Sequence, residues 1–444
     1  MKYVFSAWNA RLRTGRLLMA LALGLVLNVA NAAPRTVLDY PALDATAVVA
    51  SPEVPESAFH AWSVSDQEAA AIVESWKKMP MTVPWTRIQL ARYVKHKMMP
   101  TRGARGLALV HTAMHDALLL SKEMKSDSRL AVSMAAAQVL AYLFPAEERA
   151  FDRIAFSLAA RVTGAPREQL PAAARGAMAL GKAVGARVVA FGEAAGAQRG
   201  WNGIRLQWYG EGRYYGPGSW EPTAPYFYYP PDEPFALGWK TWVLKEASQF
   251  RPVPPAFMSP RYLADLREVV EINKNLTPEQ LAIARFWVDG HGSVTPPGHW
   301  NQIAIDELGK HPRDDETTAR LFMHLNIAMA DAFVATWDAK YFYWTVRPVT
   351  AAKYVLGVTY KPAILTPPFP SYGSGHAGFS GAGSAITAHY FPEDGPALNA
   401  MGEEAALSRL LGGIHFRHDN EDGLALGRRI ADAVLRHFSE LPPP

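Results

Sequence analysis

Residues 371–376 read Ser-Tyr-Gly-Ser-Gly-His and lead from a proline-rich loop into an apolar segment with helical spacing. The first turn of a helix offers unpaired backbone N–H groups and a partial positive charge, so the backbone from Ser374 to His376 is able to bind an anion. The Ser374 hydroxyl adds a donor, and Gly373 and Gly375 allow a ligand to approach the backbone closely. Taken alone, the stretch also fits an ordinary helix N-cap.

A second group of polar residues follows at 408–419, which read Ser-Arg-Leu-Leu-Gly-Gly-Ile-His-Phe-Arg-His-Asp. We expect Arg409 to close one helix and the glycine pair to turn the chain, so that His415 is presented on the connection to the next helix. Asp419 can reach the His415 imidazole, and a carboxylate on one ring nitrogen makes the other nitrogen a better nucleophile or ligand. The alternative is a surface ion-pair cluster of Arg409, Arg417 and Asp419 in which His415 has no role.

Two cations precede both stretches along the chain. Lys340 and Arg347 are seven residues apart, and two helical turns place them on one helix face within about 20°. Pro348 disfavours helical geometry at Arg347, so the helix is expected to end there. Both cations would then point into one cavity. The alternative is an ordinary pair of surface cations.

Apolar residues recur with helical spacing through most of the chain, and alternating Val, Ile and Thr strands are almost absent. From Gly200 to Trp242 the composition changes to Trp, Tyr, Pro and Gly, which predicts an irregular segment that either lines a substrate channel or covers the bundle. The prediction is an all-α protein of helical bundles with this long irregular connection. The predicted helices cover 66–79, 103–121, 129–144, 147–162, 167–194, 259–274, 277–288, 298–309, 314–345, 375–390, 396–411 and 421–438.

The first 32 residues have the pattern of a secretory signal peptide. A basic start, the apolar run 17–27 and Ala30-Asn31-Ala32 fit the small-x-small cleavage rule. The apolar run is shorter than the ~20 residues that a membrane span needs, although an uncleaved anchor is the alternative. We therefore expect secretion, to a periplasm, of a protein without a later membrane span. Its predicted parts are an extended lead-in at 33–80, an N-terminal helical region at 81–250 and a C-terminal bundle at 251–444 that carries the motifs.

The composition limits the classes of partner. Apolar residues make up 49% of the chain and charged residues 19%, which is typical of a globular protein with a large core. Four of the 45 basic residues lie in the first 32 positions, and the rest balance the 41 acidic residues. This balance excludes the clustered positive charge that nucleic-acid binding needs and favours a small-molecule partner. Because the chain has no cysteine, any metal must use nitrogen or oxygen ligands.

Taken together, three motifs resemble the signatures of the type 2 phosphatidic acid phosphatase (PAP2) and vanadium-dependent haloperoxidase superfamily. They are Lys340-x6-Arg347-Pro348, Ser374-Gly375-His376 and Ser408-Arg409-x3-Gly413-x-His415, and their order and spacing match. Further stretches at 111–116, 286–290, 296–301 and 328–332 resemble the vanadium haloperoxidase branch. The resemblance covers most of the chain beyond about residue 80. One position departs from the pattern, since Gly373 stands where the family usually has proline.

The resemblance implies a role for each motif residue. His376 would be the acid/base group, and His415 would be the axial vanadium ligand or, in a phosphatase, the nucleophile that forms a phosphohistidine. Trp337 and Phe369 fall at the positions of the halide-pocket aromatics, and Asp289 would pair with Arg409. The catalytic groups would thus be His376, His415, Lys340 and Asp419, and the equatorial oxygens of vanadate or phosphate would be held by Lys340, Arg347, Ser374, Gly375 and Arg409.

Two enzyme activities and one binding function follow from this resemblance. The first is a vanadate-dependent haloperoxidase that oxidises halide with hydrogen peroxide. The second is a soluble periplasmic acid phosphatase that acts on a phosphate monoester without a cofactor, because vanadate and the phosphoryl transition state share a shape. The third is a non-catalytic oxyanion-binding protein. The length favours the first, since a minimal phosphatase bundle would not need the N-terminal half.

Overall fold

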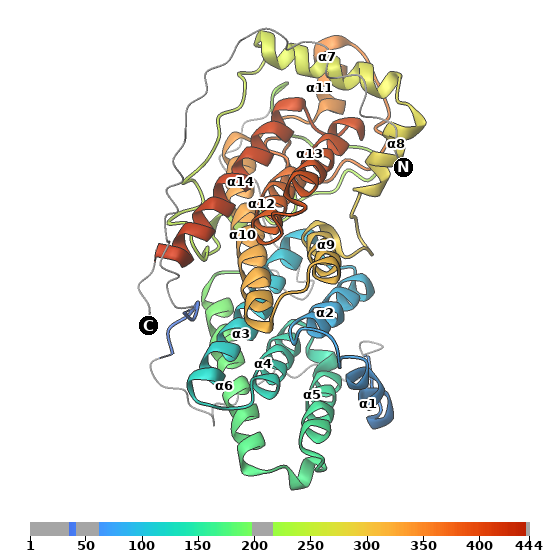
Figure 1. Cartoon of the computed structure of the whole chain (residues 1–444). Helices are drawn as coiled ribbons and strands as arrows, with labels where there is room; N and C mark the ends of the chain where they lie inside the picture. The colour runs from blue at the N-terminus through green and yellow to red at the C-terminus, as the bar shows by residue number, and fades with distance from the viewer. Residues whose placement is uncertain (1–34, 41–61, 198–215, 441–444) are drawn as a thin grey trace, which may run out of the picture.

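The structure is a computed structural model that describes residues 35–40, 62–197 and 216–440. Its regular secondary structure within these ranges is helical, apart from one isolated bridge between Ser219 and Thr345. The all-α prediction is therefore confirmed (Figure 1). The predicted signal peptide, residues 33–34 and 41–61 of the lead-in and residues 198–215 of the irregular connection lie outside the described residues.

The helices form a lower and an upper group in Figure 1, and α10 runs between them. The lower group contains α1 (Asp66–Glu74), α2 (Val83–His96), α3 (Pro100–Glu123), α4 (Ser128–Leu143), α5 (Glu148–Thr163) and α6 (Ala172–Ala194). The remaining helices are α7 (Pro260–Lys274), α8 (Pro278–Phe286), α9 (Thr295–Lys310), α10 (Asp315–Tyr343), α11 (Pro348–Leu356), α12 (Gly375–Tyr390), α13 (Gly395–Leu411) and α14 (Arg417–Glu440).

Each group has its own hydrophobic core. The first core is built mainly from buried side chains of α3, α4, α5 and α6, such as Leu107 and Phe151. The second is built mainly from α9, α10, α12 and α14, but it also takes in Val83 and Ala104 of the lower group. Helix α10 packs against α3 as well as α12. The boundary predicted at residue 250 stays a prediction, and the second core extends across it.

The described part of the irregular connection, residues 216–244, covers α10. Trp220 and Trp239 are buried in the second core, where Trp220 packs edge-on against Trp344 and Trp239 against Phe333. Asp331 of α10 accepts hydrogen bonds from the backbone nitrogens of residues 242–244 at 2.9, 2.8 and 3.2 Å. Burial raises the Asp331 pKa to about 6, although these hydrogen bonds and Arg105 oppose the rise. A buried carboxylate therefore fixes the end of a segment whose helical structure, within its described residues, is limited to the short 3-10 turn Ala236–Gly238.

Most predicted helices are confirmed within a few residues, and the differences have local causes. The helix predicted from 167 begins at Ala172, because Pro171 before it is extended (φ −55°, ψ 151°) and the chain from Arg167 to Gln169 forms a short 3-10 turn. The helix predicted from 421 begins at Arg417. Helices α2 and α11 were not predicted, and both carry proline in the first turn, where its missing N–H costs nothing.

The prediction that Lys340 and Arg347 share one helix face is wrong. Helix α10 ends at Tyr343, and Trp344 takes a left-handed conformation (φ 54°). The Trp344 carbonyl accepts from the Trp220 nitrogen at 2.9 Å, and the Val346 nitrogen donates to the Gly218 carbonyl at 3.0 Å. These backbone groups form hydrogen bonds with the irregular connection and do not continue the helical hydrogen bonds of α10. Arg347 is therefore not part of α10 and is the N-cap of α11.

Helices α12 and α14 pack so closely that their backbones are in contact. A Cβ added at Gly381 would lie 2.2 Å from the Leu424 carbonyl oxygen, and one added at Gly427 would lie 2.2 Å from the Gly378 carbonyl oxygen. Real Cβ atoms do not come this close to other atoms, so the contact needs glycine at both positions. The close approach brings the first turns of the two helices together, where the Ser374 nitrogen donates to the Asp419 carbonyl at 2.8 Å.

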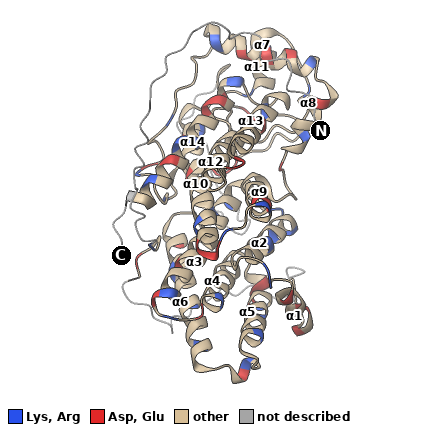
Figure 2. Ribbon diagram, in the orientation of Figure 1, with Lys and Arg blue, Asp and Glu red and all other residues tan. Residues whose placement is uncertain are grey.

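Charged side chains of both signs are scattered along both groups of helices in Figure 2. None of the helices in the part of the chain that the structure describes has the length and apolar character needed to cross a membrane. Several cations are nevertheless buried, and Lys340, Arg347 and Arg409 are the ones that the sequence assigned to a site.

The α12–α14 contact predicts the effect of adding one methyl group. We expect Gly381→Ala to lower the free energy of unfolding by about 1–3 kcal/mol, because the helices must separate to admit the Cβ. Gly176→Ala in α6 is the matched control, since its Cβ would meet no atom within 4 Å. That change should raise stability by about 0.4–1 kcal/mol. Thermal unfolding checks both, and equal midpoints for the two variants would contradict the packing argument.

Candidate functional site

The three sequence motifs meet at one place in the structure, between the C-terminal ends of α10 and α13 and the N-terminal ends of α12 and α14. Lys340 reaches the loop before α12, where its Nζ donates to the Ser371 carbonyl at 2.9 Å. Arg347 reaches the loop before α14, where its Nη1 lies 3.0 Å from His415 Nε2. Residues from four helices and their loops therefore form one site.

Lys340 is fully buried at the end of α10. Its Nζ donates to the carbonyls of Pro370 at 2.8 Å and Ser371 at 2.9 Å. The Phe369 and Trp337 rings flank the ammonium group, with centroids 4.9 and 5.7 Å from Nζ. Burial, together with the charge of Arg347, holds the Lys340 pKa well below its ordinary value. A negatively charged ligand would oppose this lowering of the Lys340 pKa.

Arg347 is also fully buried. Its Nε donates to the Phe369 carbonyl at 2.8 Å, and its Nη1 donates to the Ile414 carbonyl at 2.9 Å and to His415. Its Nη2 is buried and has no hydrogen-bond partner. Burial lowers the Arg347 pKa to about 9, and the charge of Asp419 opposes the fall. A buried guanidinium N–H without a partner leaves a donor free for a ligand.

His415 is held in one tautomer by its two neighbours. Its Nδ1 lies 2.9 Å from Asp419 Oδ2, and a carboxylate can only accept, so Nδ1 carries the hydrogen. Its Nε2 accepts from Arg347, so Nε2 carries a lone pair. Burial and the charge of Arg347 hold the His415 pKa well below its ordinary value, while Asp419 opposes the shift. His415 is therefore a neutral imidazole with its Nε2 lone pair beside a buried cation.

The Ser-Gly-His motif begins α12 as predicted. Ser374 is the N-cap, and its Oγ accepts from the Ala377 nitrogen at 3.3 Å, which leaves the hydroxyl hydrogen for another acceptor. A Cβ at Gly375 would lie 3.1 Å from the Trp337 ring and 3.9 Å from Lys340 Cε, so glycine permits a tight approach here. The N-cap interpretation is therefore confirmed, and the anion-site interpretation stays a prediction.

His376 lies in the first turn of α12, and its Nε2 is buried without a hydrogen-bond partner. The nearest carboxylate is Asp289, whose Oδ2 lies 3.9 Å away. Burial and the charges of Arg409, His299 and His415 hold the His376 pKa well below its ordinary value. An uncharged imidazole with an unpaired ring nitrogen is suited to exchanging a proton with a ligand.

Arg409 ends α13 and is buried. Its Nη2 donates to the carbonyls of Trp287 at 2.6 Å and Ala284 at 3.3 Å. Burial lowers the Arg409 pKa to about 10, and the charge of Asp289 opposes the fall. The expected ion pair between Asp289 and Arg409 is not among the contacts of the described residues, because Asp289 Oδ2 bonds instead to His299 Nδ1 at 3.1 Å.

The alternative of a surface ion-pair cluster at 408–419 is wrong. Asp419 is fully buried, and its Oδ2 accepts from His415, from the Phe416 nitrogen at 3.2 Å and from the Ser371 hydroxyl at 2.5 Å. Hydrogen bonds from His415 and Ser371 and the charge of His418 outweigh burial and hold the Asp419 pKa well below its ordinary value. Arg417 points elsewhere and pairs with Glu268 at 2.5 Å.

Sequence reasoning missed two contributors to the site. Ser371 stands in the quoted motif but was given no role, although its hydroxyl fixes Asp419. His299 was not assigned to the site, and it holds Asp289 next to His376. Ser371 could have been identified as a polar residue close to the Ser374-Gly375-His376 motif. His299 carried no such signal, because its contact with Asp289 depends on how the loop before α9 folds back onto that helix.

The two predicted halide-pocket aromatics lie at the site. The rings of Trp337 and Phe369 have centroids 4.9 Å apart, and both flank Lys340. Trp337 Nε1 donates to the Asp232 carbonyl at 3.0 Å, which ties the ring to the irregular connection. Their role in binding halide stays a prediction.

The residues present fit a tetrahedral oxyanion. The cations Lys340, Arg347 and Arg409 are buried together, and most of their protein partners are neutral carbonyls. Arg347 Nη2 and His376 Nε2 are buried without partners. A site with excess buried positive charge and free donors is completed by an anion that accepts hydrogen bonds in several directions.

Parts of the chain are similar in sequence to known proteins. The family model described as the VCPO second helical-bundle domain matches residues 320–360 and 394–442, a range that includes Lys340, Arg347, Arg409 and His415. Vanadium chloroperoxidase of Curvularia inaequalis is 29% identical over 144 residues, which cover 26% of this chain and 23% of that protein. The chain thus spans about a quarter of the length of the curated relative that it matches.

Solved structures of bacterial proteins have the same fold. A bacterial vanadium-dependent iodoperoxidase has a TM-score of 0.68 and 23% identity, over 85% of this chain and 98% of that one. A bacterial vanadium-dependent chloroperoxidase in its holo form has a TM-score of 0.61 and 17% identity, over 78% and 92% of the two chains. The chain therefore has the all-α fold of the solved vanadium-dependent haloperoxidases. The family model confirms the resemblance for the two stretches that carry Lys340, Arg347, Arg409 and His415.

Proposed function

We propose that the protein is a vanadate-dependent haloperoxidase that oxidises halide with hydrogen peroxide. The observation that carries this proposal is the His415 Nε2 lone pair, which lies 3.0 Å from Arg347 Nη1 in a buried group of cations. An imidazole nitrogen in this state is a ligand for a metal centre, and the cations around it suit the oxygens of an oxyanion. The names of the relatives support the same activity.

Five residues of the chain would hold the oxygens of vanadate: Lys340, Arg347, Ser374, Gly375 and Arg409. His415 Nε2 would be the ligand that the chain supplies to vanadium, and Asp419 would keep that nitrogen free of a proton by holding the hydrogen on Nδ1. Vanadate, when bound, supplies the centre at which hydrogen peroxide is activated for halide oxidation. The fixed positive donors stabilise negative charge on oxygen without having to reorganise.

His376 and the two aromatics have separate tasks in this proposal. The unpaired His376 Nε2 accepts or returns the proton that accompanies the reaction, with Asp289 3.9 Å away. Trp337 and Phe369 form an apolar wall beside Lys340, against which we place the halide. We also propose that residues 1–32 direct export to a periplasm and that residues 251–444 form the domain that carries the site.

A phosphatase could use the same residues, with the His415 lone pair attacking phosphorus and His376 protonating the leaving group. The orientation of His415 by Asp419 fits both reactions. The two are distinguished by their requirements, because only the haloperoxidase needs vanadate, halide and peroxide.

The first prediction concerns His415. Purified protein should brominate a phenolic dye only when vanadate, bromide and peroxide are all present, and His415→Ala should lower that rate by at least about 100-fold, as loss of one electrostatic partner does in other sites. His389→Ala, which removes an exposed histidine on α12, should keep the wild-type rate. Hydrolysis of an aryl phosphate without vanadate, and no bromination, would identify the phosphatase instead. Bound vanadate with neither activity would leave a binding protein.

The second prediction concerns oxyanion affinity. Lys340→Ala removes a fully buried cation, so we expect vanadate binding to weaken by about 2–5 kcal/mol, or about 30-fold or more. Lys353→Ala removes an exposed cation from α11 and should leave the affinity unchanged. Titration calorimetry on both proteins checks this, and equal vanadate affinity in Lys340→Ala and wild type would contradict the assignment.

The third prediction gives the sign of the pH dependence. Burial and neighbouring cations hold the pKa values of Lys340 and His376 below their ordinary values, and a bound anion favours the charged forms and raises both. Anion binding should therefore take up protons, and affinity should fall as pH rises. Sulfate is the probe because it does not titrate near neutral pH. Calorimetry in two buffers with different ionisation enthalpies measures the uptake, which should shrink in Lys340→Met, whereas proton release would contradict it.

A further inference from the structure

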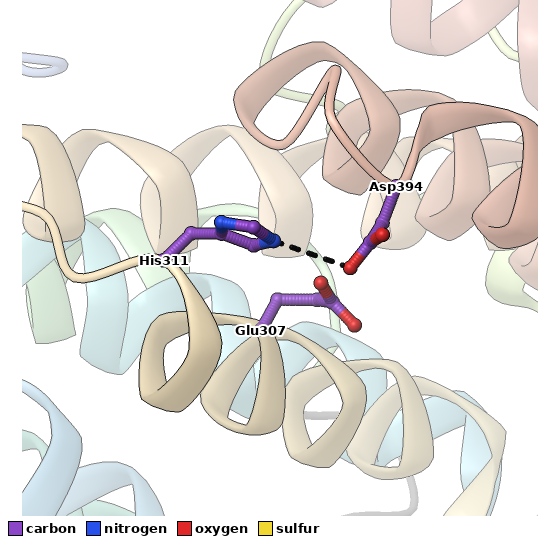
Figure 3. Close-up of side chains that lie close together, drawn as sticks. All are labelled: Glu307, His311 and Asp394. Atoms are coloured by element: carbon purple, nitrogen blue, oxygen red, sulfur yellow. Dashed lines mark hydrogen bonds and ion pairs between the residues drawn. The ribbon is translucent and has the colours of Figure 1, made fainter.

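A histidine and two carboxylates meet far from the oxyanion site, where α9 ends and α13 begins (Figure 3). Glu307 lies in the last turn of α9, His311 is the C-cap of that helix, and Asp394 is the N-cap of α13. One ligand atom from each residue lies within 4.8 Å of the other two. His311 Nε2 and Asp394 Oδ2 are 3.3 Å apart.

The Glu307 carboxylate provides the second observation. Glu307 is only 4% exposed, and its Oε2 is buried without a hydrogen-bond partner. Figure 3 shows the carboxylate extending into the space between His311 and Asp394. A buried carboxylate oxygen normally accepts at least one hydrogen bond or binds a cation.

The charges of the cluster are incompletely balanced. Lys310 Nζ contacts Glu307 Oε1 at 2.6 Å and Asp394 Oδ2 at 3.6 Å, but this side chain is 57% exposed. The nearby Arg313 is paired with Glu393 at 3.0 Å. Two carboxylates therefore share one exposed cation.

We propose that Glu307, His311 and Asp394 form a binding site for a divalent transition-metal ion of the zinc class. Zinc binds imidazole nitrogen and carboxylate oxygen together, and three protein ligands leave the remaining positions to water. His311 and Asp394 are partly exposed, with side chains 28% and 36% accessible, so the ion can enter from solvent. Lys310 swings away when the ion binds, because its long exposed side chain is free to move.

The position of the site indicates what the ion does. The ligands connect the end of α9 to the loop between α12 and α13, and α9 and α12 pack against each other. His299, which holds Asp289 beside His376, lies in the same helix twelve residues before His311, or about 18 Å along the axis. The ion would therefore connect α9, α12 and α13 at their ends far from the oxyanion site. Its expected effect is to stabilise the folded protein.

Zinc binding to tag-free protein tests the proposal. We expect Zn2+ to bind with one-to-one stoichiometry in titration calorimetry and to raise the thermal midpoint. His311→Ala and the isosteric Glu307→Gln should each weaken Zn2+ binding by at least about 10- to 100-fold, the loss found even for outer-shell partners of metals. Lys310→Ala should bind Zn2+ more tightly than wild type, because it removes the competing cation.

His389→Ala is the matched control, since it removes another exposed histidine at the end of α12. It should leave Zn2+ affinity and the zinc-dependent rise in midpoint unchanged. Equal Zn2+ affinity in wild type and Glu307→Gln would overturn the proposal, and so would weaker binding by Lys310→Ala. Zn2+ affinity and the thermal midpoint are measured without vanadate and without a bromination assay. The result for the metal site is therefore independent of the result for the proposed activity.

Discussion

The burial of three cations in one small volume is the constraint on which the rest of the site depends. Lys340, Arg347 and Arg409 are removed from water, and most of their hydrogen bonds go to backbone carbonyls. Removing a charge from water is costly unless partners replace the solvent. Carbonyl dipoles satisfy most of the N–H groups but leave Arg347 Nη2 without a partner and the positive charge unneutralised, so the loops that present these carbonyls create a site that an anion completes.

Asp419 fixes the orientation of the groups that surround these buried cations. Its carboxylate accepts from His415 and Ser371, and its backbone carbonyl accepts from Ser374. The first turns of α12 and α14 are therefore fixed against each other by one residue. The contact requires the glycines that let these helices approach at backbone distance. The packing of α12 against α14 therefore also helps to place Asp419, which sets the tautomer of His415.

Much of the site was predictable because its chemistry is carried by short motifs. A helix N-terminus after a loop predicted the position of Ser374 and Gly375, and the spacing of His415 and Asp419 predicted their hydrogen bond. The relative positions of Lys340 and Arg347 could not be predicted from their spacing. A seven-residue spacing assumes a continuous helix, and the real helix ends early because its backbone bonds to a segment more than 100 residues away.

The sequence by itself determined most of the helices and the all-α class, and it indicated the residues of the proposed oxyanion site, because helical periodicity and motif spacing are local properties of the chain. Only the tertiary structure decided which of these residues touch. The contacts of Arg409 with Ala284 and Trp287 and the meeting of Glu307 with Asp394 join segments that lie far apart in the sequence. Such contacts arise when helices pack, and no local pattern encodes them.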